Sequence, residues 1–260
     1  KVLGMTGTGG AGKSSLIDEI TLRFLNAYPD KTLAIVCVDP SKRKTGGSLL
    51  GDRIRMNSLS KDRVFMRSVA SRNSGKEISN QLPNILDFLK TLDFDFIIAE
   101  TSGIGQGNMA ITEISDISMY VMTSDFGVQS QLEKIDMIDF ADIIAVNKAD
   151  RRGAEDALRD VSKQYRRSRK IFDNSVAVPV FLTPASQFND KGVHDLFFCI
   201  AKNFPDWEMS ETYKNNLLKT EEHTIIPPER QNYLAEITNT IRRYKKRTQD
   251  LSQKASLLGS

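Results

Sequence analysis

Six short, nearly continuous runs of apolar residues recur along the chain, and helical patterns separate them. A strand that is buried on both faces of a parallel sheet needs such a continuous run, whereas a half-exposed strand alternates apolar and polar residues. The pattern therefore predicts an α/β fold, with a mostly parallel, doubly wound sheet flanked by helices. The expected strands lie at 1–6, 32–39, 94–100, 117–122, 142–148 and 176–183.

Between these runs, apolar residues return every three or four positions, which is typical of helices that pack by one face. In the first expected helix, Leu16, Ile20, Phe24 and Leu25 follow this spacing. The expected helices of this kind lie at 15–28, 79–92 and 132–140.

The character of the chain changes after residue 205, where polar residues dominate. From Glu229 onward, apolar residues at helical spacing predict an amphipathic helix whose apolar face needs a partner surface. We expect one α/β domain over 1–205, followed by a linker and the amphipathic helix over 206–260. The apolar positions of that helix are Leu234, Ile237, Ile241 and Tyr244.

Composition narrows the classes of protein to consider. Of the 260 residues, 40% are hydrophobic and 27% are charged, as in ordinary globular proteins. The 36 basic and 33 acidic residues are too evenly balanced to favour nucleic acid or a membrane as a partner. No apolar stretch approaches a membrane span and no signal peptide opens the chain, so we expect a cytoplasmic protein.

Two further observations concern the cysteines and the first residues. Cys37 and Cys199 lie in apolar surroundings and are expected to be small core residues. The chain opens without Met, directly in an apolar run, so we expect a segment of a longer polypeptide.

The stretch GTGGAGKSS, from Gly7 to Ser15, matches the phosphate-loop pattern G-x-x-x-x-G-K-[ST] and lies between an expected strand and an expected helix. Glycines let backbone N–H groups close around an anion, and the following helix adds its positive end. Lys13 is expected to reach the β- and γ-phosphates as a catalytic residue, and the Ser14 hydroxyl to bind Mg²⁺. The expected nucleotide-binding residues here are Gly9, Gly10, Ala11, Gly12, Lys13, Ser14 and Ser15.

An acidic residue on the Mg²⁺ side is expected at the end of a buried strand. In FDFIIAETSGIG, Glu100 occupies that place, and Gly103 follows where a backbone N–H meets the γ-phosphate. Glu100 is expected to act on the ion directly or through a metal-bound water, as a catalytic and metal-side residue.

The base is indicated by the sequence NKAD, which supplies Asn147, Lys148 and Asp150 at a strand end. A carboxylate at Asp150 accepts from guanine N1–H and the 2-amino group together, whereas adenine would leave it unpaired at a high cost. The motif therefore favours GTP over ATP, and an ATP-dependent small-molecule kinase would have no use for it. In TPASQ, Ala185 or Ser186 is expected to offer its backbone to the base oxygen.

Several motifs together resemble a known family. The segments 38–57, 100–106 and 147–150 resemble the P-loop GTPases that act as cobalamin chaperones, of the methylmalonyl-CoA mutase accessory type. LGDRIRMN, QLEKIDMIDFAD and ASQFND are most similar to the GTPase domains built into fused isobutyryl-CoA mutases. The resemblance implies a Mg²⁺-dependent GTPase, binding GTP and GDP, that gates adenosylcobalamin loading and protection of an acyl-CoA mutase, in cis or in trans. It leaves a homodimer open.

The resemblance also assigns residues. It places Asp39 and Asp52 on the Mg²⁺ side, and it places Asp52 with Arg55 in the first switch segment. Arg55 is expected to neutralise charge that develops on the γ-phosphate, although a surface ion pair is an alternative role. Ser124 to Lys134 matches a further switch that reports nucleotide state to the mutase.

One departure and one alternative remain. Ile104 stands after Gly103, where a Ras-like enzyme has Gln, so intrinsic hydrolysis is expected to be slow unless Gln106, Arg55 or a partner completes the site.

The alternative is a metal-delivery GTPase of the nickel-insertion type, which needs clustered Cys and His. Two distant Cys and two isolated His argue against it.

Overall fold

The computed structural model describes residues 1–40, 56–60, 62–71, 81–101, 110–126, 132, 135–173, 175–187, 189–204, 206–220, 241–245 and 247–249. The chain divides into two compact units, Lys1–Tyr213 and Lys214–Ser260. The first unit contains the sheet and the phosphate-loop sequence.

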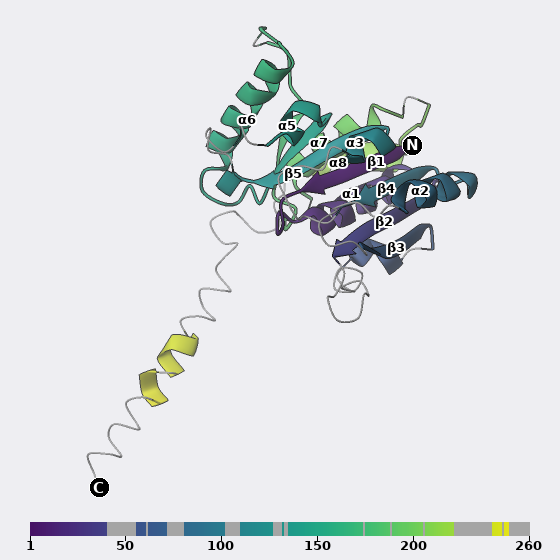
Figure 1. Cartoon of the computed structure of the whole chain (residues 1–260). Coiled ribbons are helices and arrows are strands. Elements are labelled where there is room, and N and C mark those ends of the chain that lie inside the picture. Colours follow the sequence, from purple (N-terminus) through teal and green to yellow (C-terminus); the bar gives the residue numbers. More distant parts are fainter. Residues whose placement is uncertain are drawn as a thin grey trace. The chain divides into compact units, whose positions relative to one another are not determined.

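In the described part of the chain, seven strands form one sheet in the order β3-β2-β4-β1-β5-β6-β7, and every neighbouring pair is parallel (Figure 1). The first strand therefore lies in the middle of the sheet, between β4 and β5. The predicted α/β class and doubly wound sheet are confirmed. The strands are β1 (Val2–Gly7), β2 (Leu33–Pro40), β3 (Val64–Ser71), β4 (Phe96–Glu100), β5 (Ile117–Thr123), β6 (Ile143–Asn147) and β7 (Val180–Thr183).

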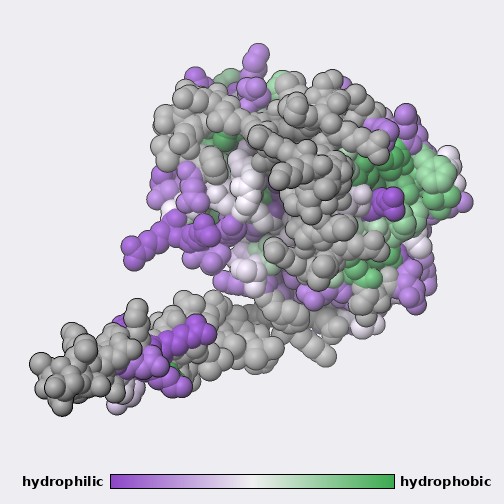
Figure 2. Space-filling view, turned by 60° about the horizontal axis from the view of Figure 1, so that its bottom comes forward, coloured by the Kyte–Doolittle hydropathy of each residue, from purple (hydrophilic) through white to green (hydrophobic). Residues whose placement is uncertain are grey.

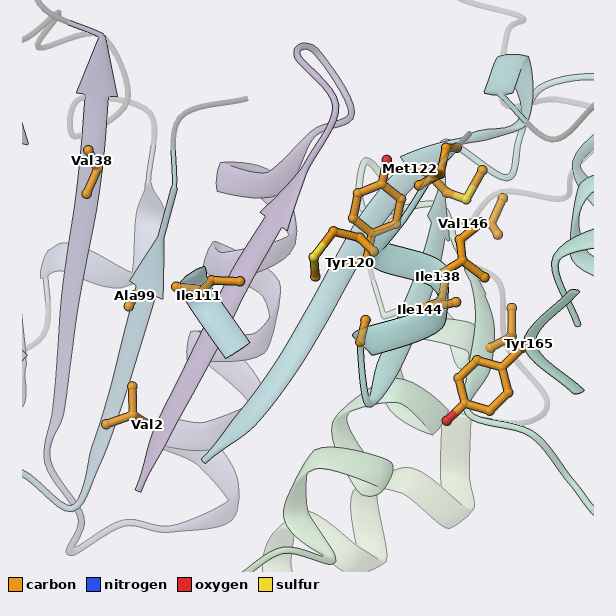
Figure 3. Packing of buried hydrophobic residues seen from close by; sticks show 14 of the residues in the cluster. Val2, Val38, Ala99, Ile111, Tyr120, Met122, Ile138, Ile144, Val146 and Tyr165 are labelled. Atoms are coloured by element: carbon orange, nitrogen blue, oxygen red, sulfur yellow. The ribbon is translucent and has the colours of Figure 1, made fainter. Parts of the chain in front are cut away.

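Helices cover both faces of the sheet. One face packs against α2 (Leu82–Thr91), α3 (Ala110–Ile114), α5 (Met137–Phe140) and α6 (Ala154–Ser168). Figure 3 shows part of this packing, in which Tyr120 of β5, Ile144 of β6, Ile138 of α5 and Tyr165 of α6 belong to one hydrophobic cluster. The strands are buried on both faces because the other face is also covered, which is why their sequences are apolar throughout.

The other face packs against α1 (Lys13–Ala27) and α7 (Lys191–Ala201), which also contact each other. Aromatic rings fill the space between these helices and β4. Phe24 of α1 lies 5.3 Å from Phe96, measured between ring centroids, and Phe204 stacks on Trp207 at 4.3 Å. Ser210 N–H then donates to Ala27 O at 2.8 Å. Trp207 and Ser210 thus pack on α1, and the first unit ends at Tyr213, within α8 (Glu211–Thr220).

All six expected strands are present, but the boundaries differ in places. The strand expected over 176–183 begins only at Val180, and in the loop before it the guanidinium of Arg166 donates to the carbonyl of Val176 at 2.7 Å. The edge strand β3 was not predicted. Its residues alternate between exposed and covered positions, with Phe65 exposed and Met66 buried, so it has no continuous apolar run.

The described part of the first unit also contains two short 3-10 turns, η2 (Asn57–Ser60) and η3 (Ser124–Phe126). Of the expected helix 132–140, the described part contains Leu132 in helical conformation and α5. In the second unit, residues 241–245 and 247–249 are helical, in agreement with the predicted amphipathic helix, and Tyr244 is 72% exposed.

The surface of the first unit has an apolar edge. Figure 2 shows hydrophobic surface gathered on the side where Figure 1 places α2 and β3. The large exposed apolar residues there are Phe65, Phe88 and Leu92. None of the helices in the described ranges combines the length and the apolar character that a membrane crossing requires. Cys37 is buried as predicted, Cys199 is half-buried, and neither cysteine forms a disulfide.

Candidate nucleotide-binding site

The phosphate-loop sequence lies between β1 and α1, at the carboxyl edge of the sheet, which is where doubly wound proteins bind ligands. Gly10 (φ 73°) and Gly12 (φ 88°) adopt left-handed backbone conformations. A Cβ atom at Gly12 would lie 2.5 Å from Asn147 Nδ2, so a side chain there would collide with the loop that follows β6. Glycine is required at Gly12 for two reasons, the backbone conformation and the close approach.

The N-terminus of α1 is open to an anion. Gly12 is its N-cap, and no side chain of the described residues caps the helix or places an acidic group in its first turn. The first N–H groups of a helix have no intrahelical partner, and they carry the positive end of the helix dipole. An anion bound in the loop would therefore meet N–H groups and no competing carboxylate from α1.

Lys13 lies under the loop and is only 7% exposed. Its Nζ donates to the carbonyl oxygens of Gly7 and Thr8, both at 3.2 Å. The ammonium group is thus held at the inner side of the loop, where the loop would enclose phosphate.

Ser14 and Glu100 come together although 86 residues separate them. The Ser14 hydroxyl lies 3.4 Å from Glu100 Oε1 and 3.5 Å from Oε2. Glu100 ends β4 and is 7% exposed, and its neighbours across the sheet are Met5 of β1 and Cys37 of β2. A hydroxyl and a carboxylate at the mouth of a phosphate loop are hard oxygen ligands, which suit Mg²⁺.

The oxygen ligands at this site suit a metal ion that is bound partly by the protein and partly by a phosphate ligand. Among the described residues, no group of three or more His, Cys, Asp or Glu could hold a metal by itself. Mg²⁺ is usually bound through one or two carboxylates, with phosphate oxygens and water completing its shell. The residues present are therefore compatible with Mg²⁺ bound together with a nucleotide.

Asn147 connects three segments of the site. It is 2% exposed, and its Nδ2 donates to Ala11 O at 2.7 Å, in the phosphate loop. Its Oδ1 accepts from Thr183 Oγ1 at 3.3 Å and from Ala185 N–H at 3.2 Å, in and after β7. The loops after β1, β6 and β7 are fixed to one another through this one side chain.

Lys148 and Asp150 follow Asn147 at the surface. Lys148 has a left-handed backbone (φ 57°), and its Nζ donates to Gly10 O at 2.5 Å, so its side chain extends along the phosphate loop. Non-glycine residues in this conformation are often functional. Asp150 is exposed, as a carboxylate that receives a base must be before the ligand binds.

The loop after β7 contains the remaining expected contacts to the base. Ala185 is buried, and its N–H is directed to Asn147, whereas Ser186 is exposed. The backbone of Ser186 is thus the more accessible of the two.

Not all residues predicted for the site belong to the described part of the chain. Asp52, Arg55, Gly103 and Gln106 lie outside the described residues, as do most positions of the switch from Ser124 to Lys134. Asp39 lies in β2 next to its last residue, with Ala70 of β3 as its neighbour, so its backbone reaches the same edge of the sheet.

Two residues that contact the site, Thr183 and Cys37, were not predicted from the sequence. Thr183 is fully buried and bonds to Asn147, and the Cys37 thiol donates to Glu100 Oε2 at 3.3 Å. Both contacts depend on strand pairing, since Thr183 pairs with Asn147 and Cys37 with Glu100. The available signal was the position of each residue at or near the end of a strand.

Comparison with known proteins gives a consistent result. The family model described as "Methylmalonyl Co-A mutase-associated GTPase MeaB" matches residues 1–225. The fused isobutyryl-CoA mutase of Geobacillus kaustophilus is 54% identical over 254 residues, covering 95% of this chain and 23% of that protein. The enzyme of the same name from Cupriavidus metallidurans is 50% identical over 253 residues, with the same shares. The chain thus spans 23% of the length of these relatives.

Solved structures agree on the fold. A LAO/AO transport system kinase has a TM-score of 0.54 at 18% identity, with 96% of this chain and 67% of that chain covered. HypB from Helicobacter pylori, in complex with nickel, has a TM-score of 0.54 at 16% identity, with 81% and 89% covered. At these identities the likeness shows the fold alone.

Proposed function

Because the chain belongs to the family of MeaB, the methylmalonyl-CoA mutase-associated GTPases, we propose that it binds GTP with Mg²⁺ and hydrolyses it to GDP and phosphate. The observation that carries this proposal is the connection of the phosphate loop to the base-side motif, through Asn147 Nδ2 and Ala11 O at 2.7 Å. One side chain thus holds together the parts that would bind the phosphates and the guanine.

Each residue then has a defined task. Lys13 would exchange the carbonyls of Gly7 and Thr8 for the β- and γ-phosphate oxygens, and the N–H groups at the start of α1 would bind the same phosphates. Ser14 and Glu100 would hold Mg²⁺, which when bound neutralises phosphate charge. Asp150 would accept from guanine N1–H and the 2-amino group.

The residues expected from the resemblance complete the proposal. Asp39 and Asp52 would act on the Mg²⁺ side, and Arg55 would neutralise charge developing on the γ-phosphate. Without a Gln after Gly103, hydrolysis by the chain alone would be slow until a partner or one of these residues completes the site.

We further propose that the nucleotide state gates adenosylcobalamin loading and protection of an acyl-CoA mutase of the isobutyryl-CoA type. Support comes from the relatives, in which a segment 50–54% identical to this chain is part of a protein named fused isobutyryl-CoA mutase. The mutase would be joined to this chain or be a separate protein. The nickel-insertion alternative rests on a likeness of fold at 16% identity and has no matching metal cluster among the described residues.

The first experiment measures thermal protection by GTP, GDP and ATP. We expect guanine nucleotides with Mg²⁺ to raise the melting temperature of the wild type, ATP to have little effect, and Lys13→Ala to abolish the protection. Lys202→Ala, which removes an exposed lysine after α7, is the matched control and should behave as wild type. Undiminished protection of Lys13→Ala by GDP would contradict the phosphate-loop assignment.

A second experiment tests the mutase. The steady-state GTP hydrolysis rate of this chain is measured alone and then with the cobalamin-binding and mutase portions of a fused relative. A marked change in rate supports the gating role. GTP binding with an unchanged rate would leave the GTPase proposal intact and remove the mutase as the partner.

A further inference from the structure

The Glu100 carboxylate is contacted both from the phosphate-loop side, by α1, and from the neighbouring strand β2. On the α1 side, the Ser14 hydroxyl approaches Oε1 at 3.4 Å. On the β2 side, the Cys37 thiol donates to Oε2 at 3.3 Å. Cys37 is 1% exposed and Glu100 is 7% exposed, so the thiol contact lies in the protein interior.

Strand register brings Cys37 to this place. Cys37 and Glu100 are direct neighbours in the parallel pairing of β2 with β4, so their side chains leave the sheet on the same face. This is the face that α1 covers, and Ser14 lies in the first turn of α1. The thiol, the carboxylate and the hydroxyl therefore form a short row from the sheet to the start of the helix.

The thiol has a physical effect on the carboxylate. The last torsion of a Glu side chain is broad and weakly restricted, so an unsupported carboxylate samples many orientations. A donor on Oε2 restricts the rotation of the group, while the Ser14 hydroxyl lies within 3.5 Å of both oxygens. Restricting this rotation in advance lowers the entropy that is lost when a ligand binds. Cysteine suits the position because it packs as a small apolar residue and still supplies a weak donor.

We propose that Cys37 is a positioning residue that orients Glu100 for Mg²⁺. This inference rests on the proposed function, in which Glu100 serves the Mg²⁺ side of the GTP site. It adds a residue outside the phosphate-loop and base motifs to the site.

The hydrogen bond itself can be tested without nucleotide. In Cys199→Ala, Cys37 is the only thiol of the chain, and its S–H stretching band can be read by infrared spectroscopy. We expect the band at lower wavenumber than for a thiol without an acceptor, and we expect Glu100→Gln to move it upward, because an amide oxygen is a weaker acceptor than a carboxylate. A band that does not respond to Glu100→Gln would overturn the proposal. This readout does not depend on GTPase activity.

The effect on Mg²⁺ is tested by the Mg²⁺ concentration that gives half-maximal GTP hydrolysis. We expect Cys37→Ala to raise it about fivefold, the effect of one lost hydrogen bond, with kcat at saturating Mg²⁺ nearly unchanged. Cys37→Ser keeps a donor and should restore most of the affinity, while Cys199→Ala should match wild type.

The outcomes separate the two proposals. If the wild type does not hydrolyse GTP, the proposed function fails, and the infrared result still decides whether the thiol orients Glu100. If the wild type is active and Cys37→Ala has an unchanged Mg²⁺ requirement, the positioning role is refuted. Equal shifts in Cys37→Ala and Cys37→Ser, together with lowered melting temperatures, would assign Cys37 to packing alone and also refute it.

Discussion

Replacing Asn147 by Ala should destabilise the protein strongly even without nucleotide. Asn147 is 2% exposed, and its amide bonds to Ala11 O at 2.7 Å, to Thr183 Oγ1 at 3.3 Å and to Ala185 N–H at 3.2 Å. The substitution removes these bonds and leaves the backbone groups of Ala11 and Ala185 without this partner.

The magnitude follows from those groups. A buried donor or acceptor left without a partner costs about 1–3 kcal/mol, so two backbone groups give about 2–6 kcal/mol before any relaxation. Water entering the space of the lost amide would satisfy part of this need. We therefore expect Asn147→Ala to lower the free energy of unfolding by about 3 kcal/mol. Thr183→Val removes only the 3.3 Å hydroxyl bond and should cost about 1 kcal/mol.

Urea unfolding of the nucleotide-free protein measures both values, and an unchanged slope would show that both variants unfold as the wild type does. In the double variant the two effects should not add, because both substitutions break the same contact. The reasoning is refuted if Asn147→Ala costs less than Thr183→Val, or if it leaves stability unchanged and alters only nucleotide affinity.

Three further predictions concern other parts of the first unit. Asp150→Asn should change the preference from GTP to xanthosine triphosphate, because the amide offers a donor to the new base carbonyl. Competition binding measures this preference. A variant that still prefers GTP would count against the proposed base pocket. The Asp18 carboxylate accepts from the N–H groups of Asn57 and Ser58 at 3.0 and 2.8 Å. Asp18→Ala should therefore lower the free energy of unfolding by about 2 kcal/mol in urea melts. An unchanged free energy would show that η2 does not need the Asp18 carboxylate. Burial, with the nearby Arg23 guanidinium, lowers the pKa of His194 to about 4 from 6.5. Between these two pH values the unfolded chain therefore binds a proton that the folded chain does not. The free energy of unfolding should fall by up to about 3 kcal/mol from pH 6.5 to pH 4. A series of melts over this pH range should show a smaller fall for His194→Gln.

The sequence was sufficient for the parts of the fold that are buried on both sides. The six continuous runs became β1, β2, β4, β5, β6 and β7, because a strand covered on both faces has apolar residues throughout. The edge strand β3 was not predicted from the sequence because Phe65 and Arg67 are exposed, and a short half-exposed strand has no distinctive hydrophobic period.

In the candidate site, residues that belong to local motifs were predictable, and residues that strand pairing brings into the site were not. Lys13, Ser14 and Asn147 could be predicted as candidates because each belongs to a local motif whose spacing carries the chemistry. Thr183 and Cys37 were not found, because their contacts with Asn147 and Glu100 arise from the pairing of strands distant in sequence. Strand order and register are tertiary properties, which a single sequence does not give directly.

The central position of β1 also has a consequence for the synthesis of the protein. Its partners are β4 and β5, which follow it in the sequence, so β1 has neither neighbour to pair with until residues 96–100 and 117–123 have emerged from the ribosome. At typical translation speeds this delay is on the order of 10 s, during which an apolar strand remains unpaired. Asn147 and Thr183, which hold the phosphate loop to the rest of the site, emerge later still. In a nascent chain, the contacts that hold the phosphate-loop sequence in place therefore form only near the end of translation of the first unit, and until then β1 is an unpaired apolar segment.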